Sequence, residues 1–290
     1  MAAAAVASGY DPNFLGVPAP LPVPHQVVRE LAYTHFTVLL DPVRRLAATT
    51  GVTIDGAALQ DLDRVDDWRL DPRVPAQEQT GEQVYAGNDL DRGHLVRRRD
   101  PVWGPSAVAQ TANEQTFTYT NAAPQAAQFN QSRLLWAGLE DYVLEHARTY
   151  RQRLCVFTGP VLATDDPPYR GVQIPRRFYK IAAWATGSAD GAATLAATGY
   201  VLDQTPELPD LPAATARAEL AGEPPPLGPY RTYQVPIADI ATLTGLDLGP
   251  LVSADRLPSV VTVSADMLTS ATAAESGRWV QLHDLTDIRL

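Results

Sequence analysis

Hydrophobic positions fall into short runs with the composition of β-strands over most of this chain, and into one longer helical period in its middle. Two runs rich in threonine and valine, at residues 33–40 and 46–54, flank Asp41-Pro42 and predict a hairpin. A short turn-bounded segment at 84–90 also favours an extended conformation. Further strands are expected at residues 154–158, 178–186 and 193–202.

The helical period follows Asn130 and ends near Gln152. Apolar residues recur there at spacings of three and four, which predicts one apolar stripe, formed by Leu134, Leu135, Leu139, Tyr142, Val143 and Ala147. Asn130 falls at or just before the first turn, where asparagine is a favoured N-cap residue. A shorter helix is expected at 237–243. Strands mixed with a few helices predict an α+β fold.

The proline content divides the chain. Residues 1–24, rich in proline from Gly9 onward, predict an extended arm ahead of a large domain at 25–290. Within that domain, the proline- and alanine-rich segment 203–230 predicts a surface insertion. Arm and insertion are candidate docking elements, with solvated linkers as the alternative. At 290 residues and 45% hydrophobic content, the chain can bury a substantial core.

Composition excludes several classes of protein. No apolar run approaches the length of a membrane span, and the segment Met1 to Ala7 lacks the charged and apolar regions of a secretory signal. We therefore expect a cytoplasmic protein with no membrane partner, or one delivered by a non-classical route. Cys155 is the only cysteine, which excludes an intrachain disulfide and a cysteine-based metal or redox site.

The most informative local feature is Asp91-Arg92-Gly93-His94, followed downstream by Asn130. A histidine supplies a base that titrates near neutral pH, and an asparagine supplies a hard oxygen for a divalent cation. Hydrolysis of a phosphodiester needs a deprotonated water and positive charge near the phosphate oxygens. One base, one cation site and an adjacent arginine therefore point to phosphodiester chemistry.

The sequence around this motif resembles the DNA/RNA non-specific endonuclease family, the ββα-metal nucleases that include mitochondrial endonuclease G. The resemblance rests on the stretch from Tyr85 to Arg98, on Asp100-Pro101-Val102-Trp103-Gly104, and on Asn121-Ala122-Ala123-Pro124-Gln125. It extends from about Tyr33 into the C-terminal third, through Thr158-Gly159-Pro160 and Leu243-Thr244-Gly245-Leu246-Asp247. It implies a central antiparallel sheet with flanking helices.

The resemblance also implies roles for individual residues. His94 would be the general base and Asn130 the one direct protein ligand of Mg²⁺, with Mn²⁺ as a substitute. Arg92 would lie near the phosphate and Glu140 would orient metal-bound waters, while Asn121 and Gln125 would shape the substrate site. The spacing from Asn130 to Glu140 is two residues longer than in well-known members of the family. Those members also carry an arginine one turn after the glutamate, where this chain has Leu144. Arg148 or an arginine from elsewhere would have to replace it.

The chain carries a formal net charge of −10, yet Arg97, Arg98 and Arg99 form a local positive run after the motif. Such a run is an ordinary solvated surface in many proteins. Beside a phosphate-cleaving motif, we expect these arginines to contact the nucleic-acid backbone, because steering depends on the local field more than on total charge.

The sequence thus predicts a Mg²⁺-dependent, sugar-non-specific endonuclease that cuts DNA and RNA with little base readout. A catalytically silent nucleic-acid-binding or assembly module is the first alternative, and a sequence-specific homing or restriction nuclease is the second. An unspecific nuclease threatens its own chromosome, which suggests an inhibitor, activation by oligomerisation, or delivery by a partner system. A defence effector and a delivered toxin both fit this setting.

Overall fold

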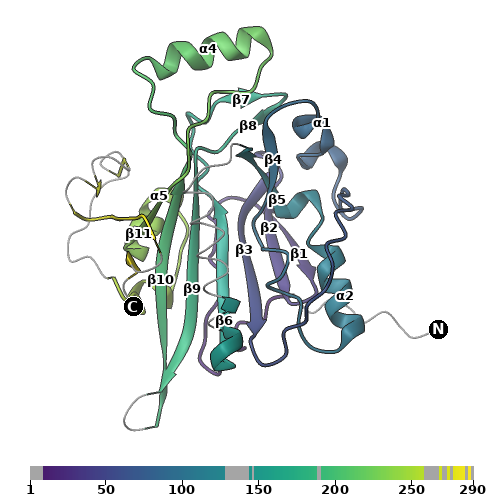
Figure 1. Ribbon diagram of the computed structural model, residues 1–290, viewed down its shortest axis with the longest axis vertical. Coiled ribbons are helices and arrows are strands. Elements are labelled where there is room, and N and C mark those ends of the chain that lie inside the picture. The colour runs from purple at the N-terminus through teal and green to yellow at the C-terminus, as the bar shows by residue number, and fades with distance from the viewer. Residues whose placement is uncertain are drawn as a thin grey trace.

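The computed structural model describes residues 9–127, 144–145, 147–187, 191–257, 268–269, 273–274, 277–284 and 287–288. Within these residues, a sheet of eight strands forms the centre of the molecule (Figure 1). Its neighbours pair antiparallel throughout. Their order across the sheet is β1 (Arg29–Tyr33), β2 (Phe36–Asp41), β3 (Leu46–Asp55), β6 (Arg153–Pro160), β9 (Arg177–Gly187), β10 (Ala193–Asp203), β11 (Arg231–Val235) and β12 (Val280–Leu282).

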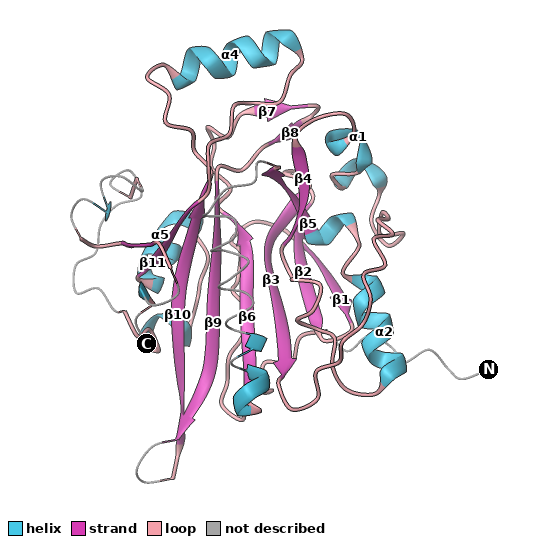
Figure 2. Ribbon diagram, in the orientation of Figure 1, coloured by secondary structure: helices cyan, strands magenta, loops and turns pink. Residues whose placement is uncertain are grey.

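Shorter elements surround this sheet. Two small ribbons pair β4 (Leu90–His94) with β5 (Ala122–Ala126) and β7 (Pro168–Tyr169) with β8 (Val172–Gln173). The helices are α1 (Glu82–Tyr85), α2 (Ser106–Gln115), α4 (Leu211–Ala221), α5 (Ile237–Thr244) and α6 (Pro250–Ser253), with 3-10 turns at Ala76–Glu78 and Tyr119–Asn121. Figure 2 shows α1 and α2 near the β1–β3 end of the sheet and α5 beside β10 and β11. The expected α+β fold with a central antiparallel sheet is confirmed.

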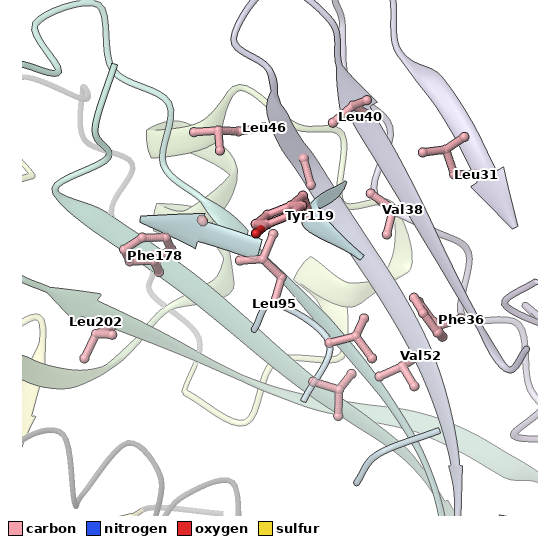
Figure 3. Packing of buried hydrophobic residues seen from close by; sticks show 14 of the residues in the cluster. Leu31, Phe36, Val38, Leu40, Leu46, Val52, Leu95, Tyr119, Phe178 and Leu202 are labelled. Carbon is pink, nitrogen blue, oxygen red and sulfur yellow. The ribbon is translucent and has the colours of Figure 1, made fainter. Parts of the chain in front are cut away.

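Both faces of the sheet carry buried side chains, and successive side chains of one strand contribute to opposite faces. In β6, Leu154 and Val156 belong to one hydrophobic cluster, whereas Cys155 and Phe157 belong to another. The first cluster lies between the sheet and the β4–β5 ribbon, and Figure 3 shows part of its packing. Its labelled members are Leu31, Phe36, Val38, Leu40, Leu46, Val52, Leu95, Tyr119, Phe178 and Leu202. The ribbon that carries the Asp-Arg-Gly-His motif is therefore fixed to the sheet by hydrophobic packing.

The described part of the proline-rich arm packs against the opposite face of the sheet. Tyr10 lies edge-on to Phe157 with ring centroids 5.4 Å apart, and its hydroxyl donates to the carbonyl of Ala19 at 2.5 Å. Val23 pairs through its backbone with Asp247, after α5. This segment adds hydrophobic side chains to the second cluster instead of projecting into solvent as a linker would. The division of the chain into an arm and a domain stays a prediction.

The segment expected to be an insertion contains α4, which stands away from the sheet at the top of Figure 1. No residue of α4 is buried. Asp210 caps its first turn by accepting from the amide of Ala213, and Gly222 ends it in the left-handed conformation at φ 69°. Tyr230, at the end of the segment, is 2% exposed and donates to the carbonyl of Ala126 at 2.5 Å. The segment is therefore anchored where it returns to the sheet.

The expected β2–β3 hairpin and the strands in β6, β9 and β10 are confirmed, as is the helix at α5. The expected strand at 33–40 begins too early. Tyr33 is the last residue of β1, His35 turns the chain at φ 67°, and β2 begins at Phe36. The extended segment at 84–90 is wrong: α1 extends to Tyr85, a turn follows with Gly87 at φ 67°, and β4 begins only at Leu90. Most of the long helix after Asn130 and of the loop at 271–277 lies outside the described residues.

Candidate active site

The β4–β5 ribbon brings the motif and the downstream Asn-to-Gln segment together. His94 pairs with Ala122, and Asp91 pairs with Gln125. Gly93 lies under the Gln125 side chain, where an added Cβ would come within 2.1 Å of Gln125 Cδ. The motif glycine therefore leaves room for the side chain of Gln125, which a larger residue would displace.

His94 lies at the end of β4 between aromatic rings. The centroids of Trp68 and Phe117 lie 4.7 Å and 5.1 Å from that of the imidazole. Its Nε2 atom is buried and has no hydrogen-bond partner among the residues that the structure describes. Burial lowers the pKa of His94 to about 3, with smaller contributions from the positive charges of Arg64 and Arg98. The expectation that this base titrates near neutral pH is therefore corrected: in the free protein the imidazole is neutral near pH 7, and its nitrogen lone pair binds a proton less readily than that of an ordinary histidine.

A cavity of about 640 Å³ opens beside His94. Its described lining carries five arginines against two aspartates, so its local charge is opposite in sign to that of the whole chain. The lining residues are Arg64, Asp66, Trp68, Asp91, Arg92, Gly93, His94, Arg97, Arg98, Arg99, Gln125, Leu202 and Tyr230. The structure thus brings together His94, Arg92, the three consecutive arginines and Gln125, all of which the sequence singled out.

Arg64 was not anticipated from the sequence. It stands among aspartates in the segment before β4, and its guanidinium donates to Asp66 at 2.9 Å. The indole N–H of Trp68 donates to the same carboxylate oxygen at 3.2 Å. Asp66 thus holds both a cation and the aromatic ring that packs on His94. A lone arginine within an acidic stretch was the one sequence signal for this contact.

Arg92 is held by residues outside the described cavity lining. Its guanidinium forms an ion pair with Glu82, which also accepts from the Tyr119 hydroxyl at 2.6 Å. The guanidinium carbon lies 5.6 Å from the centroid of the Tyr85 ring. Arg92 is thereby fixed in place beside His94, as a charge near a reacting phosphate needs to be.

Asn121 is fully buried and does not line the cavity. Its amide nitrogen donates to the carbonyls of Val96 and Thr116 at 2.9 and 3.0 Å, and its oxygen accepts from the amide of Val96 at 2.8 Å. These bonds use the hydrogen-bonding capacity of the side chain. Asn121 therefore positions the chain that follows His94, and its assignment to substrate binding stays a prediction.

The three consecutive arginines reach the cavity from a turn after β4. Arg98 donates to the carbonyl of Leu62 at 2.7 Å, and Arg99 donates to Asp61 at 2.9 Å. Burial, followed by the charges of Arg99 and Arg64, lowers the pKa of Arg98. The positive groups therefore crowd one another, which favours an anion in the cavity.

Asn130 and Glu140, the residues predicted to hold and support a metal ion, lie outside the described residues. Among the described residues, no group of three or more His, Cys, Asp or Glu side chains is placed to bind a metal. The side-chain carboxylate and amide oxygens of the described lining belong to Asp66, Asp91 and Gln125. Carboxylate and amide oxygens are the ligand types that suit Mg²⁺ or Mn²⁺, so the chemistry of the lining fits such an ion.

No helix within the described ranges is long and apolar enough to cross a membrane.

Comparisons with known proteins converge on one family. The sequence model of the DNA/RNA non-specific endonucleases matches residues 21–255. The uncharacterized protein y4fB of Sinorhizobium fredii is 38% identical over 261 residues, which cover 82% of this chain and 38% of that protein. Mitochondrial endonuclease G of Homo sapiens is 28% identical over 211 residues, which cover 69% of this chain and 61% of that protein. The chain thus spans only part of the length of each relative.

The fold agrees with that result. A crystal structure of the EndoG/EndoGI complex, which concerns the inhibition of EndoG, matches this chain with a TM-score of 0.53. The match covers 77% of this chain and 86% of that chain at 20% sequence identity. The shared architecture is that of the ββα-metal nucleases.

Proposed function

Because this chain belongs to the DNA/RNA non-specific endonuclease family, a family of metal-dependent nucleases, we propose that it hydrolyses phosphodiester bonds of DNA and RNA. The observation that carries the proposal is the buried Nε2 of His94, which has no hydrogen-bond partner among the described residues and lies beside a cavity whose described lining carries five arginines. A neutral base next to concentrated positive charge suits proton abstraction from water close to a bound phosphate.

His94 would take the proton from the attacking water. Arg64 and Arg98 oppose the resulting imidazolium in the free protein, because both lower the pKa of His94. A phosphate bound among the arginines would offset their charge, so proton transfer to His94 becomes easier when substrate is present. The base would therefore act mainly on water that faces a bound phosphodiester.

Arg92 would stabilise the charge that develops on the phosphate oxygens, since Glu82 and Tyr119 hold its guanidinium in a fixed orientation. Asn130 would hold Mg²⁺, or Mn²⁺ in its place, and the bound ion would supply positive charge for the leaving 3′-oxygen. By family resemblance, Glu140 would order water molecules near Asn130. Gln125 would shape the floor of the cavity above Gly93.

Recognition would be of the backbone. Arg97, Arg98 and Arg99 offer charged donors to phosphates, which DNA and RNA share. A nuclease without base preference needs control inside a cell, and we propose that an inhibitor protein or oligomerisation supplies it. A defence effector and a delivered toxin are both roles in which a nuclease is controlled in this way.

The test is cleavage of plasmid DNA and of RNA by the purified protein in Mg²⁺ or in EDTA. His94→Ala should lower the rate by about 10²- to 10⁴-fold, as loss of a general base does. His283→Ala, at an exposed histidine near the C-terminus, serves as the matched control and should cleave normally. Wild-type protein that binds nucleic acid without cutting it in Mg²⁺ or Mn²⁺ would instead support a silent binding module.

The metal assignment has its own test. Asn130→Ala should raise the Mg²⁺ concentration needed for half-maximal rate, because the remaining ligands would be water and phosphate. An unchanged metal titration would assign the ion to another residue.

A further inference from the structure

Asp61 joins two arginines that lie far apart in the sequence. One of its carboxylate oxygens, Oδ1, accepts from Nη2 of Arg99 at 2.9 Å and from Nη2 of Arg148 at 2.8 Å. The side chain of Asp61 is 69% exposed, whereas those of the two arginines are about one-third exposed. Two guanidinium groups therefore converge on a single anionic oxygen at the protein surface.

Two arginine donors that converge on one carboxylate oxygen could bind a phosphate oxygen in the same way. Arginine binds carboxylate and phosphate with the same planar set of donors. Arg148, followed by Arg99, lowers the pKa of Asp61, so its carboxylate is ionised at neutral pH. An exposed ion pair of this kind contributes little free energy. A phosphate of a polynucleotide could therefore replace the carboxylate without a large cost.

The position of the pair places it beyond the reaction centre. Arg99 lines the cavity beside His94, whereas Arg148 is not part of the described lining. The two arginines therefore continue the positive charge of Arg97 and Arg98 outward across the cavity edge.

A neighbouring part of the surface has different electrostatics. A second hollow of about 600 Å³ shares Asp66, Trp68 and Arg92 with it. Its described lining adds Asp67, Glu82 and Arg69, so three acidic groups stand against two arginines there. Among the described surfaces, the Arg99 and Arg148 edge is therefore more favourable to a polyanion than this hollow.

We propose that Arg99 and Arg148 form a second phosphate-binding subsite, which engages a nucleic-acid phosphate next along the strand from the scissile one. In the free protein Asp61 occupies this subsite, and substrate displaces its carboxylate. The inference rests on the proposed function, because it takes nucleic acid as the substrate. It assigns Arg148 a role in binding the polynucleotide, with no part in the chemical step.

Binding should reveal the subsite directly. A labelled DNA duplex of roughly 20 base pairs would be titrated by fluorescence anisotropy in EDTA, over a series of salt concentrations. Asp61→Asn removes the carboxylate charge that both arginines share and should tighten binding about 1.5- to 5-fold, the range expected from removing one exposed ion pair. Arg148→Gln should weaken binding and reduce the salt slope by up to about 0.9 log unit for the lost phosphate contact.

The ion pair between Arg29 and Glu78 provides matched controls, since Arg29 is exposed on β1, Glu78 is partly exposed in the 3-10 turn Ala76–Glu78, and neither belongs to the described cavity lining. Glu78→Gln and Arg29→Gln make the same charge changes as the two test variants. A general charge effect would alter binding equally in controls and test variants, and that result would overturn the proposal.

Cleavage supplies the second readout. Arg148→Gln should lower kcat/KM for the polynucleotide and leave kcat/KM for bis(p-nitrophenyl) phosphate unchanged, because the small diester cannot reach the subsite. An equal loss on both substrates would indicate a structural or catalytic role and reject the subsite. If wild-type protein neither binds the duplex nor cleaves either substrate, the proposed function itself fails. If wild type binds and cleaves while both test variants match their controls, only the subsite fails.

Discussion

The protonation of His94 offers the sharpest test of the site. An ordinary histidine has a pKa of 6.5, whereas burial and then the charges of Arg64 and Arg98 lower the pKa of His94 to about 3. At 1.36 kcal/mol per pH unit, protonating His94 in the folded protein costs about 5 kcal/mol more than in the unfolded chain. A general base works only when neutral. The acid limb of kcat/KM should therefore lie well below pH 6.5.

The same shift links pH to stability. Because the pKa of His94 is lower in the folded state than in the unfolded state, its contribution to the free energy of unfolding is complete above pH 6.5. It is lost progressively as the pH falls from 6.5 toward about 3, where the folded protein also takes up the proton. His94→Ala should remove this dependence, so wild type and variant should differ in the slope of stability against pH within that window.

Two measurements check this reasoning. An NMR titration of the His94 ring in EDTA reports its pKa in the free protein, and the pH profile of kcat/KM for bis(p-nitrophenyl) phosphate reports it in catalysis. Arg64→Gln should raise the pKa of His94, because the charge of Arg64 lowers that pKa more than the charge of Arg98 does. Arg29→Gln should leave the pKa of His94 unchanged. A ring titration or an acid limb near pH 6.5 in the wild type would refute the buried, arginine-flanked environment.

Three further variants, two single and one triple, probe the groups around the base. Asn121→Ala leaves the backbone N–H and C=O of Val96 and one further carbonyl without partners, so urea unfolding should show a loss of about 3 kcal/mol or more; wild-type stability would contradict its positioning role. Gly93→Ala should displace the flexible side chain of Gln125 and lower kcat/KM while costing only about 1 kcal/mol in the free energy of unfolding, and full activity would mean that Gln125 has no role in the site. Reversing the three arginines at 97–99 to glutamate should weaken binding of DNA and RNA alike and flatten its salt dependence; an identical salt slope would place them on a solvated face.

Local patterns in the sequence determined the elements whose conformation depends mainly on their own residues. Alternating, β-branched runs predicted β6, β9 and β10, and the Asp41-Pro42 turn predicted the β2–β3 hairpin. The Asp-Arg-Gly-His motif identified the base and its neighbouring arginine from their chemistry. The run at 97–99 likewise indicated positive charge in an acidic chain, because three consecutive arginines produce a local field whatever the fold.

Only the tertiary structure decided which distant residues share the site. In the turn before β4, Asn88 donates to the hydroxyl of Tyr169 at 3.1 Å, a contact across 81 positions that hydrophobic periodicity does not encode. Asn121 resembles a substrate-site residue in sequence, yet it is completely buried and its side chain bonds the backbone of Val96 and Thr116.

Arg64 and Asp61 give no strong signal by themselves. The first lines the cavity, and the second joins Arg99 to Arg148 across a separation of 49 positions only after the chain has packed. The sequence specifies side-chain chemistry and local conformation. The burial of His94 and the convergence of Arg99 and Arg148 arise from long-range packing against the sheet.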